Sequence, residues 1–397
     1  MSHTHRPPAG TSEAADWDPR APEVLADQRA AYDAMRSRCP VARDPAGGWT
    51  LFRHDDVLRV LRDHEGFSNA VSHHISVPNG MDPPTHTIYR RLIEPYFDEA
   101  LVAAFEPPCR RIAADLVGAT CARQRVEVMG DLALPFAARA QCAYLGWPMD
   151  LAAPLIDWTI RSHDATLEGD RRTLDTIARE LELLVADLIA SREARPTTAD
   201  PSDLTDRLLR ETVDGRLLTR EELTSLLRNW TMGEVATLAG SVGIVVHALA
   251  ENIDLQYQLR RHLQLLPDAI DELLRIHGPL VSNRRTVTRP VELGGRALQA
   301  GDRLTINWIA ASRDPDVFDH PEICRLDRDP ADNLLYGAGI HVCPGARLAR
   351  LELRIVLEEL LAATLQIEPR LEASPTLATP PASGYATLPL HVIGSPH

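Results

Sequence analysis

The most informative absence from this 397-residue chain is lysine, because all 42 of its basic residues are arginine. Without lysine, the protein cannot form a Schiff base with a carbonyl substrate or with pyridoxal phosphate. A Walker-type phosphate loop, which needs a lysine, is excluded as well. The chemistry of this chain must therefore depend on other side chains or on a cofactor.

Paired cysteines and long apolar runs are also missing. The six cysteines show no C-x-x-C spacing, which argues against a disulfide framework and against a structural zinc site. No stretch of about eighteen apolar residues is present, and the chain opens with MSHTHRPP rather than with a signal peptide. A formal net charge of −14 argues against general nucleic-acid binding. We therefore expect a cytoplasmic protein that binds neither membranes nor nucleic acid.

The rest of the composition is that of a globular protein with a sizeable core, since 44% of the residues are hydrophobic and 25% are charged. Residues 1–16 are rich in Pro, Gly, Ser and His, and we expect them to form a disordered tail. Helical spacing of apolar residues dominates from Pro107 to Arg228, whereas short strands are predicted over Thr286–Leu293 and Ala297–Ile306. The sequence thus predicts one domain over residues 17–397, mainly α with a small β-rich region.

One stretch, YGAGIHVCPGARLAR from Tyr336 to Arg350, carries the strongest chemical signal. Its single cysteine, Cys343, is surrounded by glycines, and apolar residues at helical spacing follow from Leu348 onward. The thiol therefore precedes a helix N-terminus, where the helix dipole favours a thiolate. A lone thiolate with no second cysteine nearby does not suit structural zinc or an iron–sulfur cluster. It suits an axial ligand of haem iron.

This stretch resembles the haem-binding loop of the cytochrome P450 superfamily. It has the same order of an aromatic residue, the motif G-x-G-x-H-x-C-x-G and then L-A-R. Tyr336 stands where that family usually has phenylalanine. The resemblance extends from about Trp49 to Pro389 and implies a mainly helical triangular prism that binds haem b, with Cys343 as the iron ligand. A buried cysteine beside a glycine turn is the simpler alternative, but it leaves His341, the glycines and the helix unexplained.

Two more segments match the family. The segment D-P-P-x-H-x-x-x-R carries His86 and Arg90, which share one helix face, and Arg285 precedes R-P-V-E-L-G-G. By themselves His86 and Arg90 would suggest a solvated surface pair. The resemblance implies instead that they bind the haem propionates together with Arg285 and His341. Tyr336 and Gly345 complete the cofactor-binding set that it implies.

A third match is E-x-x-R at Glu272 and Arg275, with Arg328 further along the chain. In the family these three residues form a buried network that holds the segment before the cysteine loop. The resemblance therefore implies a structural role, needed for haem retention.

The long apolar helix expected from Arg220 to Asn252 departs from the family. Its equivalent usually carries an acid followed by an alcohol, which deliver protons to bound dioxygen. Alignment on Gly233 places Val235 and Ala236 at these positions, with Glu234 one residue early and Thr237 one residue late. Because one residue turns a helix by about 100°, we expect that Glu234 and Thr237 do not simply replace the pair, although they remain the catalytic candidates. Either water carries the protons or the reaction is not a simple hydroxylation.

The substrate pocket is predicted from the same resemblance. A C-terminal hairpin expected over residues 383–390 would present Tyr385 toward the cofactor, and a flexible loop would add two histidines. The predicted lining is His73, His74, Met232, Gly233, Ala236, Val281, Ser282 and Tyr385.

Electron supply by a ferredoxin and its reductase is implied as well. Arg347, Arg350 and Arg354 follow the cysteine on a helix and would offer a basic face to an acidic ferredoxin. A solvated basic face accounts for the same residues.

Three functions are compatible with these observations. The first is a monooxygenase that tailors a small organic molecule or natural product. The second is an oxidase of the same family that cross-links aromatic groups of a peptide or natural product, which the missing acid–alcohol pair favours. The third is a non-catalytic haem sensor, which would need a blocked pocket or a second protein ligand to the iron.

Overall fold

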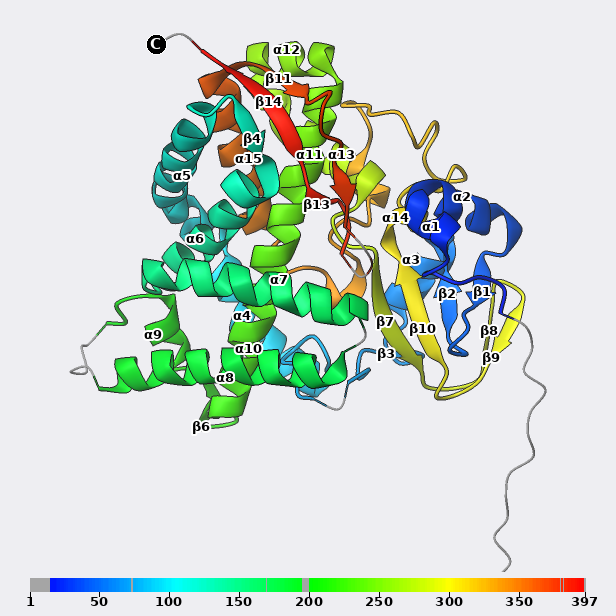
Figure 1. Ribbon diagram of the computed structural model, residues 1–397. Helices are drawn as coiled ribbons and strands as arrows, with labels where there is room; N and C mark the ends of the chain where they lie inside the picture. The colour runs from blue at the N-terminus through cyan, green and yellow to red at the C-terminus, as the bar shows by residue number, and fades with distance from the viewer. Residues whose placement is uncertain are drawn as a thin grey trace, which may run out of the picture.

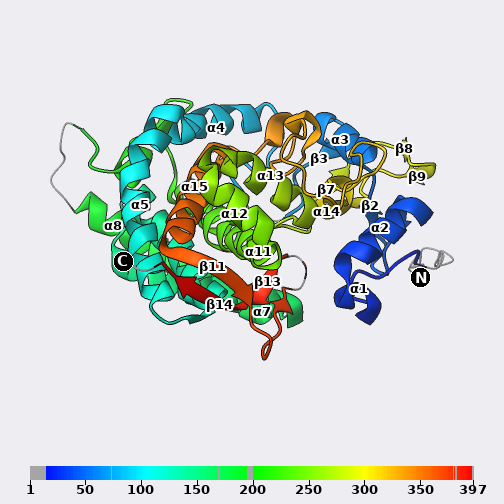
Figure 2. The same cartoon turned by 90° about the horizontal axis from the view of Figure 1, so that it is seen from above.

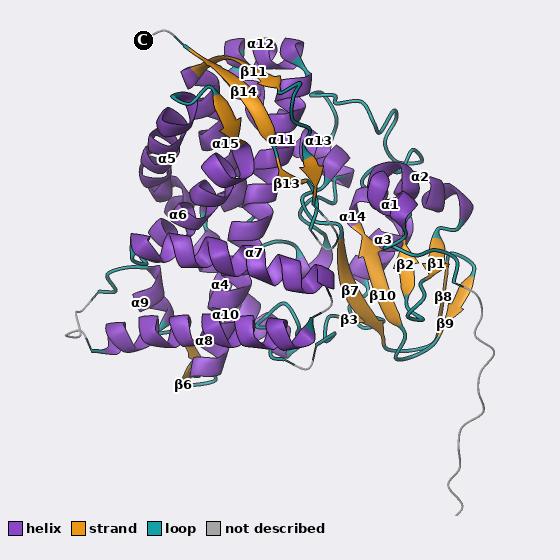
Figure 3. Ribbon diagram, viewed as in Figure 1, coloured by secondary structure: helices purple, strands orange, loops and turns teal. Residues whose placement is uncertain are grey.

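The computed structural model describes residues 15–72, 74–168, 170–194, 200–378, 380 and 382–395, so nearly all of the expected tail lies outside the described residues. Helices predominate and the strands are short, which confirms the mainly α prediction (Figure 3). The α-helices are α1 (Pro22–Ala26), α2 (Gln28–Arg38), α3 (His54–Arg62), α4 (Thr85–Ile93), α5 (Glu99–Cys121), α6 (Leu134–Leu145), α7 (Ala152–Glu168), α8 (Arg171–Glu193), α9 (Leu204–Leu208), α10 (Arg220–Thr231), α11 (Ala239–Glu251), α12 (Ile253–Arg261), α13 (Leu266–His277), α14 (Trp308–Ala311) and α15 (Ala346–Ala363).

The strands form one five-stranded sheet, one three-stranded sheet and three two-stranded pairs in the described part of the chain. They are β1 (Val41–Arg43), β2 (Trp49–Leu51), β3 (Phe67–Ser68), β4 (Arg125–Glu127), β5 (Thr212–Val213), β6 (Arg216–Leu217), β7 (Ser282–Val287), β8 (Val291–Leu293), β9 (Arg296–Leu298), β10 (Arg303–Asn307), β11 (Thr364–Pro369), β12 (Thr376–Leu377), β13 (Tyr385–Thr387) and β14 (Pro389–Gly394).

The central helix runs through the body of the molecule (Figure 1). A capping box between Thr219 and Glu222 starts α10, the π-helix η4 (Met232–Leu238) continues it, and α11 completes it. Every residue from Ala239 to Val246 is buried. In the described residues this is the one helix, Arg220–Glu251, long and apolar enough to cross a membrane, and 61% of its most apolar window is buried inside the fold.

Three separate hydrophobic cores hold the fold. The largest joins the helices and includes Tyr96, Phe136 and Val242. A second lies around the five-stranded sheet, with Leu51, Phe67 and Ile306, and a third joins α1 and α2 to that sheet. Figure 2 shows α1 and α2 beside the sheet, on the far side of the molecule from α5 and α8.

The five-stranded sheet has the order β1-β2-β10-β7-β3, and only β2 and β10 run parallel. The strands expected over Thr286–Leu293 and Ala297–Ile306 are each divided. Pro290 lacks the N–H that would continue β7, and a turn with Gly301 at φ +91°, closed by Asp302 N–H on the Gln299 carbonyl, separates β9 from β10. The expected turn at Gly294 and Gly295 is present between β8 and β9. These interruptions leave β7 and β10 paired with each other, with Arg285 opposite Leu304.

The hairpin expected over residues 383–390 is also wrong. Strand β13 pairs with β12, whereas β14 pairs with β11 and β4 in a different sheet. Leu388, Leu390 and Val392 are buried, so packing of their side chains draws this segment away from β13.

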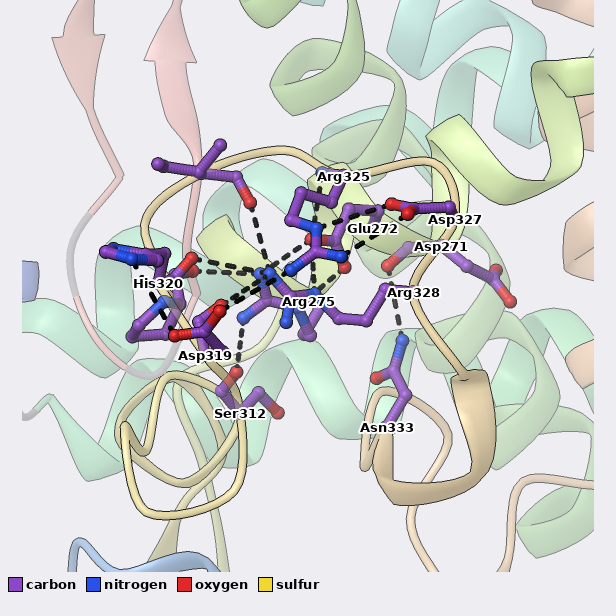
Figure 4. Close-up of polar contacts among 12 residues, drawn as sticks. Asp271, Glu272, Arg275, Ser312, Asp319, His320, Arg325, Asp327, Arg328 and Asn333 are labelled. Carbon is purple, nitrogen blue, oxygen red and sulfur yellow. Dashed lines mark hydrogen bonds and ion pairs between the residues drawn. The ribbon is translucent and has the colours of Figure 1, made fainter.

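The Glu272–Arg275–Arg328 network is confirmed (Figure 4). Arg275 Nε lies 2.7 Å from Glu272 and Arg328 Nε lies 2.9 Å from the same carboxylate. Arg275 also donates to the carbonyls of Ser312 and Pro321, at 2.7 and 2.8 Å. The network thereby ties α13 to the segment that leads into the cysteine loop.

Candidate active site

A cavity of about 360 Å³ lies between the central helix, α4, β7 and the loop that precedes α15. It brings together all the residues that were predicted to bind the cofactor, although they come from three separate parts of the chain. They are His86, Arg90, Arg285, Tyr336, His341, Cys343 and Gly345. Gly233, Glu234 and Thr237 line the same cavity from the central helix.

Glycines give the cysteine loop its shape. Gly337 and Gly339 have φ of +74° and +71°, and the Cys343 N–H donates to the Tyr336 carbonyl at 2.8 Å. A Cβ on Gly339 would lie 2.2 Å from the Leu61 carbonyl oxygen, so this residue must be glycine for the loop to pack on α3. Cys343 is thereby held in the cavity wall just before α15.

We expect Gly339→Ala to lower stability clearly more than Gly337→Ala. Both substitutions place alanine in the left-handed region, which costs about 1–2 kcal/mol. At Gly337, however, the nearest atom to the new Cβ is 3.8 Å away, whereas at Gly339 the backbone of Leu61 must move. Denaturant unfolding of the two variants measures the difference, and equal losses would show that the loop does not need close contact with α3.

The surroundings of Cys343 shift the pKa of its thiol in opposite directions. Burial raises its pKa most, and the Glu234 carboxylate raises it further, while the backbone N–H groups of Gly345 and Ala346 and the guanidinium of Arg90 lower it. The predicted stabilisation of the thiolate by the helix N-terminus is therefore present but is outweighed by burial. A bound cation at the sulfur would reverse the balance, because a coordinating thiol is deprotonated.

One wall of the cavity holds cationic and imidazole groups. Arg90 pairs with Glu94 at 3.0 Å. Among the described residues, Arg285, His86 and His341 have no anionic partner. The rings of His86 and His341 lie 4.3 Å apart, and the Nε2 atom of each is buried without a hydrogen-bond partner. Burial lowers the pKa of His86, and burial with neighbouring positive charges lowers that of His341 to about 3. Arg285 is 5% exposed, donates to the Arg284 carbonyl at 2.8 Å, and has its pKa lowered by burial to about 10. A ligand with carboxylates would satisfy all of these groups, so the residues fit haem propionates.

The central helix forms the facing wall. Because η4 is a π-helix, its turn is wider than that of an α-helix, and Glu234 and Thr237 both line the cavity. The one-residue offset thus leaves both side chains at the cavity, and that they do not simply replace the acid–alcohol pair stays a prediction. Val235 is fully buried and Ala236, also predicted for the pocket, does not line the cavity.

Most other predicted pocket residues lie elsewhere. Val281 and Ser282 face a second cavity of about 410 Å³ beside Trp17 and Tyr32, because β7 turns them toward the N-terminal helices. Tyr385 Oη instead hydrogen-bonds His247 Nδ1 at 2.8 Å.

Two further pocket predictions also fail, and one lies outside the structure. Met232 is 43% exposed and His74 is exposed, so neither lines the cavity. His73 lies outside the described residues.

Several lining residues were not predicted. Asn229 and Trp230 lie one helical turn before Gly233, so helical spacing could have identified them. Phe97, Gln141 and Asn283 come from other elements, and no local pattern marks them.

The arginines expected to receive a ferredoxin are largely engaged within the chain. Arg350 pairs with Asp271 at 2.7 Å and lies over the Tyr336 ring, with its Cζ 4.4 Å from the ring centroid. Arg354 pairs with Glu106 and Glu358, at 2.8 and 2.9 Å. Arg347 remains exposed.

A lone cysteine at a helix N-terminus, facing a cavity whose wall offers a buried guanidinium and two imidazoles to carboxylates, defines a haem-thiolate site. Comparison with known proteins agrees. The family model for cytochrome P450 matches residues 110–383, more than half of the chain. The chain belongs to the cytochrome P450 superfamily, whose members are enzymes that bind haem b.

Similar proteins include biosynthetic enzymes. Cyclomarin C epoxidase CymV of Salinispora arenicola is 32% identical over 84% of this chain and 88% of its own length. Erythromycin C-12 hydroxylase of Saccharopolyspora erythraea is also 32% identical, over 85% of this chain and 88% of its own. Among solved structures, cytochrome P450 CYP109Q5 from Chondromyces apiculatus has a TM-score of 0.86 at 27% identity, covering 96% of this chain and 98% of that one.

Proposed function

We propose that this P450 is a monooxygenase that tailors a natural product. The observation that carries the proposal is the position of Cys343, which faces the same cavity as the buried Arg285 guanidinium and the unpartnered Nε2 atoms of His86 and His341. When bound there, haem b supplies an iron that activates dioxygen, and the cysteine thiolate donates electron density to it.

Each residue of the site then has a definite task. Cys343 binds the iron, while His86, Arg90, Arg285 and His341 bind the propionates. Tyr336 keeps an aromatic ring near the sulfur. Gly345 lies beside the sulfur, where a Cβ would make ordinary contacts at 4.0 Å from Cys343 Sγ and 3.7 Å from the Phe97 ring.

The cavity lining supports a substrate with a large apolar surface and a few hydrogen-bonding groups. Aromatic and aliphatic side chains such as Phe97 and Trp230 predominate, and the amides of Asn69, Asn229 and Asn283 are placed among them. A natural product such as those named for the epoxidase and hydroxylase relatives has this chemistry.

The alternatives lose support. Oxidative coupling of aromatic groups was favoured because the acid and the alcohol are missing from their usual positions, but Glu234 and Thr237 both line the cavity and offer an acid and an alcohol there. A sensor would need a blocked cavity, whereas the space of about 360 Å³ is bordered on the helix side by Gly233.

We infer that the enzyme works in the cytoplasm and receives electrons from a ferredoxin and its reductase. Its relatives of the bacterial soluble type support this inference. Because Arg350 and Arg354 are already paired, Arg347 and the backbone around Cys343 are the better candidates for contact with the ferredoxin.

The optical spectrum of the reduced protein under carbon monoxide tests the proposal. A Soret maximum at the thiolate-haem position is expected, followed by spin-state shifts when candidate natural products are added. A maximum at the histidine-ligated position, or no haem band, would refute it.

A further inference from the structure

One face of the five-stranded sheet is polar, although residues of α1 and α2 lie over it (Figure 1). On β10, Thr305 and Asn307 alternate with the leucine and isoleucine side chains of the second hydrophobic core and therefore point to the opposite face. Strand pairing places Thr50 of β2 opposite Thr305, and Ser282 of β7 opposite Asn307. Because a covered sheet face is normally apolar, these four side chains, here called the polar floor, require an explanation.

The polar floor lines the second cavity, and its polar groups are largely without partners. Thr50 is 3% exposed and Asn307 is 1% exposed. The Oδ1 atom of Asn307 accepts a hydrogen bond from the Ala310 N–H at 2.9 Å. Among the residues that the structure describes, however, its Nδ2 atom and the hydroxyls of Thr50, Ser282 and Thr305 form no hydrogen bond. Burial of such groups costs free energy, which a ligand with matching groups would recover.

The opposite side of the cavity is aromatic and firmly held. The Trp17 ring packs edge-on against Phe52 and Tyr32, with ring centroids 4.9 and 6.1 Å apart. Beside it, the Asp16 N–H donates to the Arg43 carbonyl at 2.9 Å, which attaches this segment to β1. The Nε1 atom of Trp17 is buried without a hydrogen-bond partner. The aromatic side therefore contributes one more unused donor to the same cavity.

The second cavity is separate from the active-site cavity, and a single segment forms the wall between them. Leu280 and Asn283 line the active-site cavity, whereas Val281 and Ser282 line the second cavity. Cys343 lines the active-site cavity, and it is not among the described residues that line the second one. A molecule in the second cavity would therefore lie behind this wall, away from the iron ligand.

We propose that the second cavity is a binding site for a neutral small molecule rich in carbonyl or ether oxygens. The unused groups of Trp17 and Asn307 are donors, so the ligand must supply acceptors. The charged lining residues Arg20 and Asp44 balance each other, which favours a neutral ligand, and Leu25 adds apolar surface. The volume of about 410 Å³ lies in the range of small-molecule sites, about 300–1,000 Å³. None of the cofactor-binding residues takes part, so this proposal does not depend on the proposed function.

Nuclear magnetic resonance of protein labelled with ¹⁵N-tryptophan tests the site. The reduced carbon monoxide complex is diamagnetic, and its six tryptophans give six indole signals. Trp17 reports on the second cavity and Trp230 on the active-site cavity, and Trp17→Phe and Trp230→Phe assign the two signals. The probe is coumarin, a flat neutral lactone. We expect coumarin to shift the Trp17 signal in a saturable manner, whether or not the Trp230 signal responds.

Two variants of the polar floor make the test specific. Thr50→Val and Thr305→Val remove a hydroxyl with little change of shape, and each should weaken the affinity read at Trp17 by about threefold to tenfold. The response of Trp230 should stay unchanged. Thr286→Val is the matched control, since Thr286 also lies in the pairing of β7 with β10 but outside the cavity lining.

Two results would overturn the proposal. A Trp17 signal that coumarin leaves in place up to its solubility limit would mean that the cavity holds water alone. Equal affinities at Trp17 in the wild type and in both floor variants would mean that coumarin binds elsewhere or does not use the polar floor.

Discussion

Replacement of Cys343 by alanine is expected to abolish the thiolate-type spectrum of the reduced carbon monoxide complex completely. Cys343 is the one cysteine among the residues that line the cavity, and the loop around it holds the sulfur at the start of α15. No other thiol can take its place, because Cys109 and Cys142 are buried in the helical core and their pKa values are strongly raised. Spectra of the purified variant, reduced under carbon monoxide, measure the effect.

Two further variants test whether the thiolate-type spectrum depends on Cys343 in particular. Cys343→His should move the Soret maximum to the histidine-ligated position if haem still enters the cavity. Cys121→Ser, which changes a partly buried cysteine on α5 outside the cavity, should retain the wild-type spectrum. A thiolate-type band in Cys343→Ala would show that another sulfur binds the iron.

The second large effect is expected from Arg275→Ala, which should lower the free energy of unfolding by about 3–5 kcal/mol and weaken haem retention. Arg275 is 1% exposed, and its removal leaves the Glu272 carboxylate buried with Arg328 as its remaining cationic partner. The carbonyls of Ser312 and Pro321 lose their donors at the same time. Denaturant unfolding and the haem content after gel filtration measure the two effects.

Arg325→Ala is the matched control for this experiment. Arg325 belongs to the same cluster, but its side chain is 41% exposed and it pairs with Asp327, which is exposed as well (Figure 4). Exposed ion pairs contribute little to stability, so this variant should behave like the wild type. Similar losses of unfolding free energy in both variants would show that the loss in Arg275→Ala does not come from the unpaired buried charge of Glu272.

The cofactor side of the site was predictable from sequence because each of its parts is a contiguous motif. His86 and Arg90 are four residues apart on one helix, and His341 and Cys343 lie in one glycine-rich loop. In such motifs the local backbone determines where the side chains point, so residue spacing alone predicts which side chains lie together.

The substrate side was not predictable, because its geometry depends on non-local pairing. The direction of Val281 and Ser282 follows from the position of β7 in the sheet, and the direction of Tyr385 follows from the pairing of its strand, β13, with β12. Likewise, the π-helical turn that brings Glu234 and Thr237 into the cavity has no recognised sequence signal.

The three separate hydrophobic cores have a consequence for how the protein unfolds. The cavity is bordered by Leu61 and Trp308 from the sheet region and by Ile93 and Leu348 from the helical body. A ligand held there by Arg285 from β7 and by Cys343 before α15 bonds the two regions to each other. Because such a ligand binds only the folded arrangement, loading should stabilise the packing of the helical body against the sheet region. The cofactor would thus add bonds across the boundary between two hydrophobic cores, besides being a reactive centre.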